Sequence, residues 1–376
     1  MQVPFPDFER LHKSGRIKFL YVGGKFLIYN SKDSSIFEIP EIPPMYKEEV
    51  ITTPKPPVKT LILHTTYQCN FGCTHCYMNA GETVREEMNS DELSRIVREF
   101  GQMGGLGVDL SGGEALLKPD IEKVIDCARK QKLRTVVLSN AGKINRDQIK
   151  RIAPQIDGIA VGIDGLYEAN DQIRGKGTFN RILNGLEIIA GEGVELSFTT
   201  LITPQSIPQL LDFPEFIKKY GGRSWSLVMP RPSGRFADKT DLIAETYTQW
   251  GEAKRSGLLT QLQDLTKPAG ISVILDHILV PGSKKRVEES SRSFVYDLYN
   301  RGRACWDNTL TVMPNGDVKC CLFFDGQVYD NVRNKPLADV YQSQRREAAL
   351  IEFRKFPVDK CPFLERDKLQ DFDSKI

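Results

Sequence analysis

Three cysteines lie close together near the start of a region that alternates between strand and helix patterns. Cys69, Cys73 and Cys76 have the spacing C-x3-C-x2-C within YQCNFGCTHCYMN. Three thiolates can ligate a cubane iron–sulfur cluster and leave one iron without a protein ligand, so that a small molecule can bind that iron through nitrogen and oxygen. A zinc site completed by His75 or His64, or three unrelated buried cysteines, would fit the same spacing.

The composition limits the classes of protein to which the chain can belong. It has 376 residues, with 51 Lys and Arg against 49 Asp and Glu, a net charge of +2 that argues against a dominant electrostatic grip on nucleic acid. No apolar run approaches the ~20 residues that span a bilayer, and the first residues lack the apolar core of a signal peptide. We therefore expect a cytoplasmic protein with neither nucleic acid nor membrane as a partner. Because disulfides are rare in a reducing cytosol, we interpret its eight cysteines as metal or redox ligands in preference to disulfides.

The elements expected around the cysteine loop alternate between apolar runs and amphipathic segments. The runs cover residues 61–66, 107–112, 134–140, 158–164, 195–203 and 224–230. Strand–helix alternation predicts an α/β fold with a parallel sheet. Six units rather than eight favour a partial (β/α)6 TIM-like barrel, with a doubly wound open sheet as the alternative. The cysteine loop follows the first run, at the carboxyl end of the strands, where such folds place their chemistry.

The segments on either side of the barrel have different patterns. Residues 18–40 predict short antiparallel strands, and the Pro-rich stretch that follows predicts a linker. A hairpin is expected around PNGD (314–317). Ser90 is a plausible N-cap for the helix that it precedes. The expected domains are a β-rich segment with linker (1–56), the partial barrel (57–240), a helical connection (241–300) and a small cysteine-containing module (301–376).

Several motifs together resemble the radical S-adenosylmethionine (SAM) superfamily. The cysteine spacing with an aromatic residue next, Tyr77, resembles its signature. SGGEALL (111–117) is similar to its Gly-Gly-Glu motif, which implies that Gly112, Gly113 and Glu114 contact the methionine amino group. Glycines let a backbone approach a ligand closely, and a carboxylate suits an ammonium group.

The resemblance continues along the next strands. VLSN (137–140) matches the strand whose Ser139 and Asn140 face the ribose and the methionyl group. In VGIDGLYEANDQIRGKGTFNRILNGL the resemblance implies cofactor-binding roles for Asp164 and Arg174, and an Arg can fork onto the methionyl carboxylate. MPRPSGR (229–235) resembles the Pro–Gly–Arg turn that follows the sixth strand in the family.

The C-terminal module resembles the SPASM domain or the shorter twitch domain, which carry auxiliary iron–sulfur clusters. The resemblance rests on the spacing C-x10-G-x4-C from Cys305 to Cys321. The sequence then departs from the family, because only Cys361 follows where a full SPASM domain has a cysteine-dense stretch. The resemblance therefore implies one auxiliary cluster, held by Cys305, Cys321 and Cys361 with Cys320 or a non-cysteine group as the fourth ligand. A degenerate module without a cluster is the alternative.

The resemblance implies a radical SAM enzyme that cleaves SAM reductively at a 4Fe-4S cluster and abstracts a hydrogen atom from its substrate through a 5′-deoxyadenosyl radical. The leading hypothesis is a maturase of a ribosomally made precursor peptide, because residues 23–41 resemble N-terminal strands of peptide maturases. A separate leader-recognition protein and a flavodoxin- or ferredoxin-type electron donor are implied partners. The alternatives are an enzyme of small-molecule or cofactor-precursor chemistry and a zinc-stabilised binding protein.

The remaining candidate residues receive no catalytic role. Cys127 has apolar neighbours at helical spacing, which predicts a buried structural thiol. His12, His64, His75 and His277 have no obvious partners, and no residue stands out as a catalytic acid or base.

Overall fold

The computed structural model describes residues 7–22, 24–53, 59–81, 86–275, 309–323 and 328–354. Its strands are β1 (Ile17–Val22), β2 (Lys25–Asn30), β3 (Ser35–Ile39), β4 (Val50–Thr53), β5 (Thr60–His64), β6 (Gly107–Ser111), β7 (Arg134–Ser139), β8 (Gly158–Gly162), β9 (Leu196–Leu201), β10 (Ser224–Val228), β11 (Ser272–Leu275), β12 (Thr309–Val312), β13 (Asp317–Lys319) and β14 (Val328–Asn331). Its α-helices are α1 (Phe8–Lys13), α2 (Ser90–Gln102), α3 (Ile121–Lys130), α4 (Arg146–Ile152), α5 (Glu168–Arg174), α6 (Thr178–Gly191), α7 (Phe213–Lys219), α8 (Thr240–Arg255), α9 (Leu258–Thr266), α13 (Leu337–Tyr341) and α14 (Gln344–Arg354).

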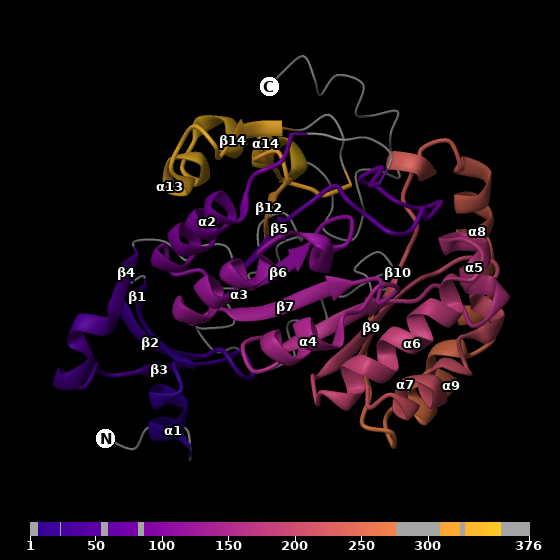
Figure 1. Cartoon of the computed structure of the whole chain (residues 1–376), viewed down its shortest axis with the longest axis horizontal. Helices are drawn as coiled ribbons and strands as arrows, with labels where there is room; N and C mark the ends of the chain where they lie inside the picture. Colours follow the sequence, from indigo (N-terminus) through magenta and orange to yellow (C-terminus); the bar gives the residue numbers. More distant parts are fainter. Residues whose placement is uncertain are drawn as a thin grey trace.

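The main sheet is a partial barrel with the order β11-β10-β9-β8-β7-β6-β5-β12-β13-β14, and helices cover its outer side (Figure 1). Strands β5 to β10 are all parallel, which confirms the predicted α/β partial barrel. Strand β11 adds a further parallel strand next to β10 and lies in the segment predicted as a helical connection. Strand β12 pairs in parallel with β5, so the C-terminal hairpin extends the same sheet.

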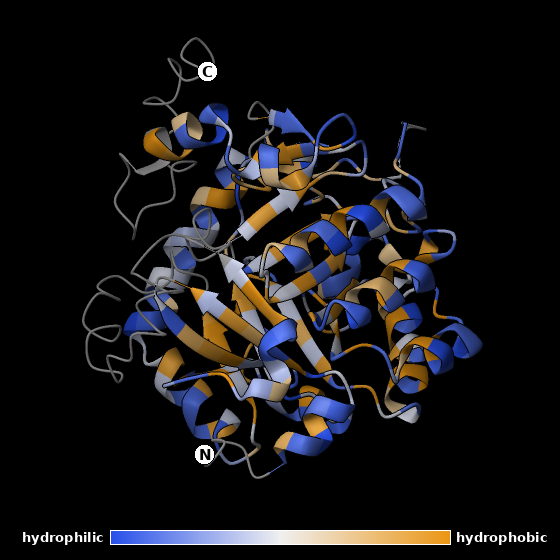
Figure 2. Ribbon diagram, turned by 90° about the vertical axis from the view of Figure 1, so that its left-hand side faces the viewer, coloured by the Kyte–Doolittle hydropathy of each residue, from blue (hydrophilic) through white to orange (hydrophobic). Residues whose placement is uncertain are grey.

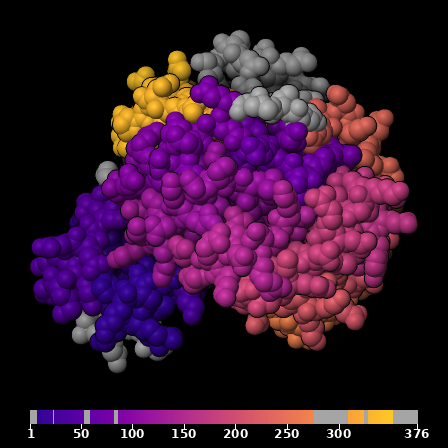
Figure 3. All heavy atoms as spheres, in the orientation of Figure 1, coloured from indigo at the N-terminus to yellow at the C-terminus, as the bar shows by residue number. Residues whose placement is uncertain are grey.

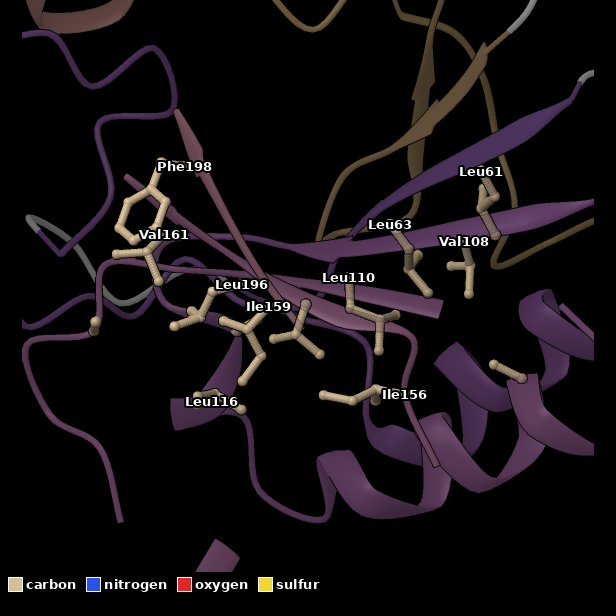
Figure 4. Packing of buried hydrophobic residues seen from close by; sticks show 14 of the residues in the cluster. Leu61, Leu63, Val108, Leu110, Leu116, Ile156, Ile159, Val161, Leu196 and Phe198 are labelled. Atoms are coloured by element: carbon tan, nitrogen blue, oxygen red, sulfur yellow. The ribbon is translucent and has the colours of Figure 1, made fainter. Parts of the chain in front are cut away.

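The barrel's hydrophobic core lies between the sheet and the helices. Along most of each barrel strand, buried residues alternate with partly exposed ones, as expected for side chains that point to opposite faces of a sheet, although β7 has three buried residues in a row. Leu61, Leu63, Val108 and Leu110 point to the helix side of the sheet (Figure 4). The apolar residues gather along the strands and the inner helix faces, and polar residues lie on the outer helix faces (Figure 2). The opposite face of the sheet, the barrel interior, is left to smaller and polar side chains.

Helix α2 begins one residue earlier than the sequence suggested. The N-cap is Asn89, whose side chain accepts hydrogen bonds from the backbone N–H groups of Asp91 and Glu92, while the Glu92 carboxylate accepts from the Asn89 N–H. The prediction that Ser90 caps this helix was therefore wrong, because Asn89 completes a reciprocal capping box and Ser90 is the first helical residue. This helix packs against α3, where Cys127 is buried as predicted.

The N-terminal segment forms a separate four-stranded sheet with the order β3-β2-β1-β4. The antiparallel pairing of β1, β2 and β3 confirms the strands predicted for residues 18–40. The stretch predicted as a linker is more structured, because β4 pairs in parallel with β1. Val50 and Ile51 have the β-branched side chains that favour a strand.

The N-terminal segment, indigo in the space-filling view, packs against one side of the barrel (Figure 3). The buried ammonium of Lys18 donates to the Gly105 carbonyl at 2.6 Å, just before β6. Arg16 forms an ion pair with Asp157, just before β8. The sheet therefore contacts the side of the barrel opposite to the carboxyl ends of the strands.

The C-terminal hairpin of β12 and β13 turns at residues 313–316, as the PNGD sequence predicted. Gly316 supplies the positive φ of +90° that such a turn requires. Cys320 is buried and Cys321 is partly buried just after β13, whereas Cys305, Cys361 and His277 lie outside the described residues. No helix in the described part of the chain is long and apolar enough to cross a membrane.

Candidate active site

A cavity of about 240 Å³ opens at the carboxyl ends of β6 to β9. Cys69, Cys73 and Cys76 all line it. Six of the predicted cofactor-binding residues share this lining, namely Tyr77, Gly112, Gly113, Ser139, Asn140 and Arg174, together with His75 and Arg235, which were not predicted. The structure therefore brings the thiols and most of the predicted cofactor-binding residues to one place.

The environment of the cysteine sulfurs suits metal-bound thiolates. The Asn140 amide donates to Cys69 Sγ at 3.6 Å, and the Ala80 N–H donates to Cys76 Sγ at 3.4 Å. Such N–H···S bonds stabilise negative charge on sulfur. Burial raises the pKa of the Cys73 thiol to about 11, so this thiol keeps its proton until a positively charged metal displaces it.

The three thiols fit an iron–sulfur cluster better than a single ion. Among the described residues, no three Cys, His, Asp or Glu side chains converge closely enough to hold one metal ion. Cluster ligands need not converge on one point, because each thiolate binds a different iron. His64 is not among the residues that line the cavity, and its ring contacts that of Tyr77 edge to face at 5.8 Å between ring centroids.

The Gly-Gly-Glu segment packs tightly against the start of the cysteine loop. Gly112 has a φ of +147°, and a Cβ at Gly113 would lie 2.3 Å from the Gln68 carbonyl oxygen, so neither position accommodates a side chain. The Glu114 carboxylate accepts hydrogen bonds from the N–H groups of Asn140 at 2.7 Å and Leu116 at 3.2 Å. Glu114 therefore fixes the backbone at Asn140, from a position behind the cavity wall.

Arg174 presents its guanidinium to the cavity and Asp164 supports it from behind. The two side chains form a buried ion pair at 2.7 Å between Arg174 Nε and Asp164 Oδ2. Burial alone would raise the pKa of Asp164, but the charge of Arg174, and then that of His75, hold it below its usual range. Gly162 leaves room for the guanidinium, since a Cβ there would lie 2.4 Å from Arg174 Nη2.

His75 and Arg235 were not among the predicted site residues. His75 Nε2 lies 3.5 Å from Asp164 Oδ2 and its ring lines the cavity, and burial lowers its pKa to about 4. Arg235 donates to the carbonyl oxygens of Cys73, at 3.1 Å, and Ala80, and so ties down the cysteine loop. The only sequence signals for them were the place of His75 between two of the cysteines and the place of Arg235 in the MPRPSGR turn.

Gly234 packs closely against the backbone of the cysteine loop, and we expect Gly234→Ala to displace that loop. A Cβ at Gly234 would lie 2.2 Å from the Cys76 carbonyl oxygen, and its φ is +52°. The variant should lower the free energy of unfolding by about 3 kcal/mol and reduce the iron bound per chain. Thermal unfolding and iron analysis after anaerobic reconstitution would test this.

Gly257→Ala is the matched control for that experiment. Gly257 also has a positive φ, +90°, but the nearest atom to its Cβ would be 3.9 Å away. We expect this control to cost about 1 kcal/mol and to keep the wild-type iron content. Equal iron in the two variants would contradict the role of Gly234 in shaping the cysteine loop.

The family assignment follows from comparison with known sequences. The family model described as "Radical SAM superfamily" matches residues 63–217, which run from β5 through the cysteine loop to α7. Residues 63–217 therefore match a radical SAM domain. This confirms the family inferred from the cysteine, Gly-Gly-Glu and VLSN motifs.

Similar radical SAM proteins include maturases and tetrapyrrole enzymes. The chain is 29% identical over 205 residues to the mycofactocin maturase MftC of Mycobacterium ulcerans, covering 52% of this chain and 55% of that protein. It is 25% identical over 302 residues to the Fe-coproporphyrin III synthase of Methanosarcina barkeri, covering 75% and 73%. The match thus spans about half the length of the MftC relatives.

Solved structures share the fold. Streptococcus suis SuiB bound to the precursor peptide SuiA matches with a TM-score of 0.70 at 15% identity, covering 91% of this chain and 90% of that chain. The enzyme anSMEcpe with bound AdoMet matches with a TM-score of 0.54, covering 77% and 82%. At these identities the likeness concerns the fold.

Proposed function

We propose that this radical SAM protein is an enzyme that binds a 4Fe-4S cluster through Cys69, Cys73 and Cys76 and uses it with SAM to modify a precursor peptide. The observation that carries the proposal is that the three thiols line one cavity with Arg174 and the Gly112–Gly113 backbone. When bound, the cluster and SAM supply a 5′-deoxyadenosyl radical that removes a hydrogen atom from the substrate.

The protein's own contribution is to hold the cofactor and shield it. The Arg174 guanidinium suits a carboxylate such as that of a methionyl group, with Asp164 fixing its orientation. The backbone of Gly112 and Gly113, supported by Glu114, suits the amino group, and Ser139, Asn140 and Tyr77 provide the remaining polar and aromatic contacts. A site enclosed in this way limits the access of water to a reactive intermediate.

The first experiment is anaerobic reconstitution with iron and sulfide, followed by incubation with SAM and dithionite. We expect formation of 5′-deoxyadenosine and methionine without added substrate. A reconstituted protein that binds stoichiometric zinc, lacks sulfide and forms no 5′-deoxyadenosine would overturn the proposal. The free thiols and low-potential electrons that this chemistry needs fit a reducing cytoplasm.

The N-terminal sheet supports a peptide as the substrate. Its order leaves β3 and β4 at the edges, and an exposed edge can bind an extended peptide by strand addition. Two similar proteins support this substrate class: MftC is a mycofactocin maturase, and SuiB has been solved bound to the precursor peptide SuiA. Because this sheet lies at the amino ends of the barrel strands, a bound leader would need a segment that passes around the barrel to the cavity.

Deleting residues 1–50 should abolish modification of a co-expressed precursor peptide while leaving radical formation intact. The deletion removes the docking surface but none of the cavity residues. Mass spectrometry of the peptide and quantification of 5′-deoxyadenosine would separate the two effects. Unchanged peptide modification by the truncated protein would count against docking on this sheet.

A control must account for the contacts that the deletion exposes. Lys18 is buried against Gly105, and Leu106 packs with the N-terminal sheet, so loss of the segment could destabilise the barrel. Lys18→Met keeps the sheet and removes only the buried charge. We expect it to retain peptide modification. A separate leader-recognition protein would be found by its binding to the same segment. A flavodoxin or ferredoxin is the proposed electron donor.

A second candidate function is modification of a tetrapyrrole or another cofactor precursor. It is favoured by the match to the Fe-coproporphyrin III synthase, which covers more of both chains than the maturase matches. This function predicts substrate-stimulated SAM cleavage with a porphyrin precursor and no effect of any peptide.

We also propose one auxiliary iron–sulfur cluster in the C-terminal module, with Cys321 and Cys320 as its described candidate ligands. Cys320 is buried in the core and Cys321 is partly buried after β13. Cys305 and Cys361 would complete the ligand set. Such a cluster could bind substrate or take the second electron when a product radical is oxidised.

A further inference from the structure

The cysteine loop reaches the surface of the molecule around its second cysteine. Gly72 and Thr74 are exposed, and Cys73 between them is only partly buried. A Cβ added at Gly72 would meet no atom within 4 Å, so the backbone there is open to solvent. The Thr74 N–H donates to the Ile173 carbonyl oxygen at 2.9 Å, which places this part of the loop beside the end of α5. One of the proposed cluster ligands therefore lies close to the outer surface.

Phe71 connects the cavity with the same surface. Its buried ring is part of the cavity lining. The guanidinium carbon of Arg181, an exposed residue in the first turn of α6, lies 4.7 Å from the centroid of this ring. Arg181 is held there by a hydrogen bond from its Nε to the Gly142 carbonyl oxygen at 3.2 Å. The ring of Phe71 thus contacts both the cavity and an exposed cation.

Further positive charges lie on either side of Arg181. Lys143 directly follows the carbonyl that Arg181 binds, and Lys176 lies in the turn between α5 and α6; both are exposed. Asp171 contributes a negative charge, and its carboxylate accepts hydrogen bonds from two N–H groups at the start of α6. Three cations outweigh this carboxylate, so the surface is locally positive although the whole chain has a net charge of only +2.

We propose that this surface, formed by Gly72, Thr74, Lys143, Lys176 and Arg181, docks an acidic one-electron carrier protein that reduces the cluster. The inference rests on the proposed radical function and assigns the docking site of its electron donor. One electron leaves the carrier, which is oxidised, and enters the cluster, which is reduced; no bond or proton changes place. Because electron transfer slows steeply with distance, a donor is most effective where a cluster ligand lies nearest to the surface.

The charge and the position of the surface both fit this partner. A positive surface attracts an acidic protein and speeds its association, chiefly at low ionic strength. The surface lies near the carboxyl ends of the barrel strands, where the cysteine loop begins. The N-terminal sheet contacts the opposite ends, through Lys18 and Arg16. An electron donor and a peptide leader would therefore have separate places on the molecule.

The test reverses the charge of the two lysines in the variant Lys143→Glu with Lys176→Glu. The probe is a flavodoxin with a net negative charge, fully reduced for kinetics and oxidised for binding. We expect the second-order rate constant for cluster reduction, measured by stopped-flow absorbance on the holoenzyme, to fall about tenfold at low ionic strength and by less at high salt. Flavodoxin binding, measured by isothermal titration calorimetry, should weaken in parallel.

Lys150→Glu with Lys218→Glu is the matched control, because it changes the net charge of the chain by the same amount. Both lysines are exposed and lie in the last turns of α4 and α7, toward the amino ends of the strands. We expect wild-type flavodoxin binding and reduction rates in this control. Iron content and the final extent of reduction by dithionite, measured by EPR, should equal those of the wild type in both variants.

The outcomes separate this inference from the proposed function. If dithionite reduces no cluster in the wild type, the radical function fails, while calorimetric binding of flavodoxin still tests the surface. The inference is overturned if the wild type does not bind flavodoxin, or if the charge-reversal variant and its control are reduced at the same rate. Weaker precursor-peptide binding with unchanged flavodoxin reduction would equally overturn it, since the surface would then bind the substrate. If the charge-reversal variant does not fold, Lys176→Gln with Arg181→Gln serves instead, and a wild-type reduction rate would again overturn the inference.

Discussion

Replacing Cys69, Cys73 and Cys76 together by alanine is expected to remove about four iron atoms per chain and to abolish 5′-deoxyadenosine formation. The three thiols line one cavity and are its candidate cluster ligands. Cysteine binds iron as a deprotonated thiolate. Alanine has no side-chain atom that can replace this ligand. Iron, acid-labile sulfide and EPR spectra of the anaerobically reconstituted protein would measure the effect.

Cys127→Ala is the matched control for this experiment. Cys127 is a buried cysteine of helix α3 whose thiol bonds to the Ser94 carbonyl at 3.2 Å, away from the cavity. We expect the control to keep its full iron and its activity, with only a small loss of stability from the missing sulfur. Equal loss of iron in both proteins would mean that folding, rather than ligation, decides the iron content.

The iron that remains in the triple variant tests the auxiliary cluster. If about half of the iron stays bound, the C-terminal cysteines hold a cluster of their own, and an oxidative reaction with a second electron acceptor is supported. If all of it is lost, Cys320 and Cys321 are structural residues. The favoured chemistry then moves to redox-neutral reactions such as epimerisation.

The barrel could be predicted from the sequence because its strands and helices repeat a local pattern. Each of β5 to β10 has the apolar alternation or run that identifies a strand between amphipathic helices. Strands β4 and β11 were missed because each has only four residues, and their pairing with β1 and β10 is decided by tertiary contacts. The cap of α2 was misplaced by one residue because Asn89 and Ser90 are both good capping residues.

The site residues that lie together in one short motif could be predicted from the sequence. The contacts between loops that are distant in the sequence could not. Each predicted motif is a short continuous segment of the sequence, and its residues line the cavity. These motifs are the cysteine loop, the two glycines and the end of the VLSN strand. The contact of Gly234 with Cys76 and the proximity of His75 to Asp164 depend on how loops from different strands meet. The roles predicted for Glu114 and Asp164 remain predictions, and in the structure their carboxylates contact the Asn140 N–H and the Arg174 guanidinium.

Replacing Arg174 by glutamine should both weaken SAM binding and destabilise the fold. Arg174 is the cation of a buried pair with Asp164, whose side chain is only 2% exposed. Removing one partner of such a pair leaves a buried charge uncompensated, which costs about 3–5 kcal/mol. Loss of a charge-assisted bond to the methionyl carboxylate should raise the Kd for SAM about ten- to hundredfold. Chemical denaturation and equilibrium SAM binding to the reconstituted protein would measure the two effects.

The double variant Asp164→Asn with Arg174→Gln distinguishes these two roles. It removes both charges, so the free energy of unfolding should recover most of the loss, while SAM binding should stay weak because the guanidinium is still absent. Arg146→Gln, which breaks an exposed ion pair with Glu192, is the control and should change neither property. Wild-type SAM affinity in the double variant would mean that Arg174 serves only to neutralise Asp164. Weak binding in a stable double variant would instead support direct contact between Arg174 and the cofactor, because the fold no longer explains the loss.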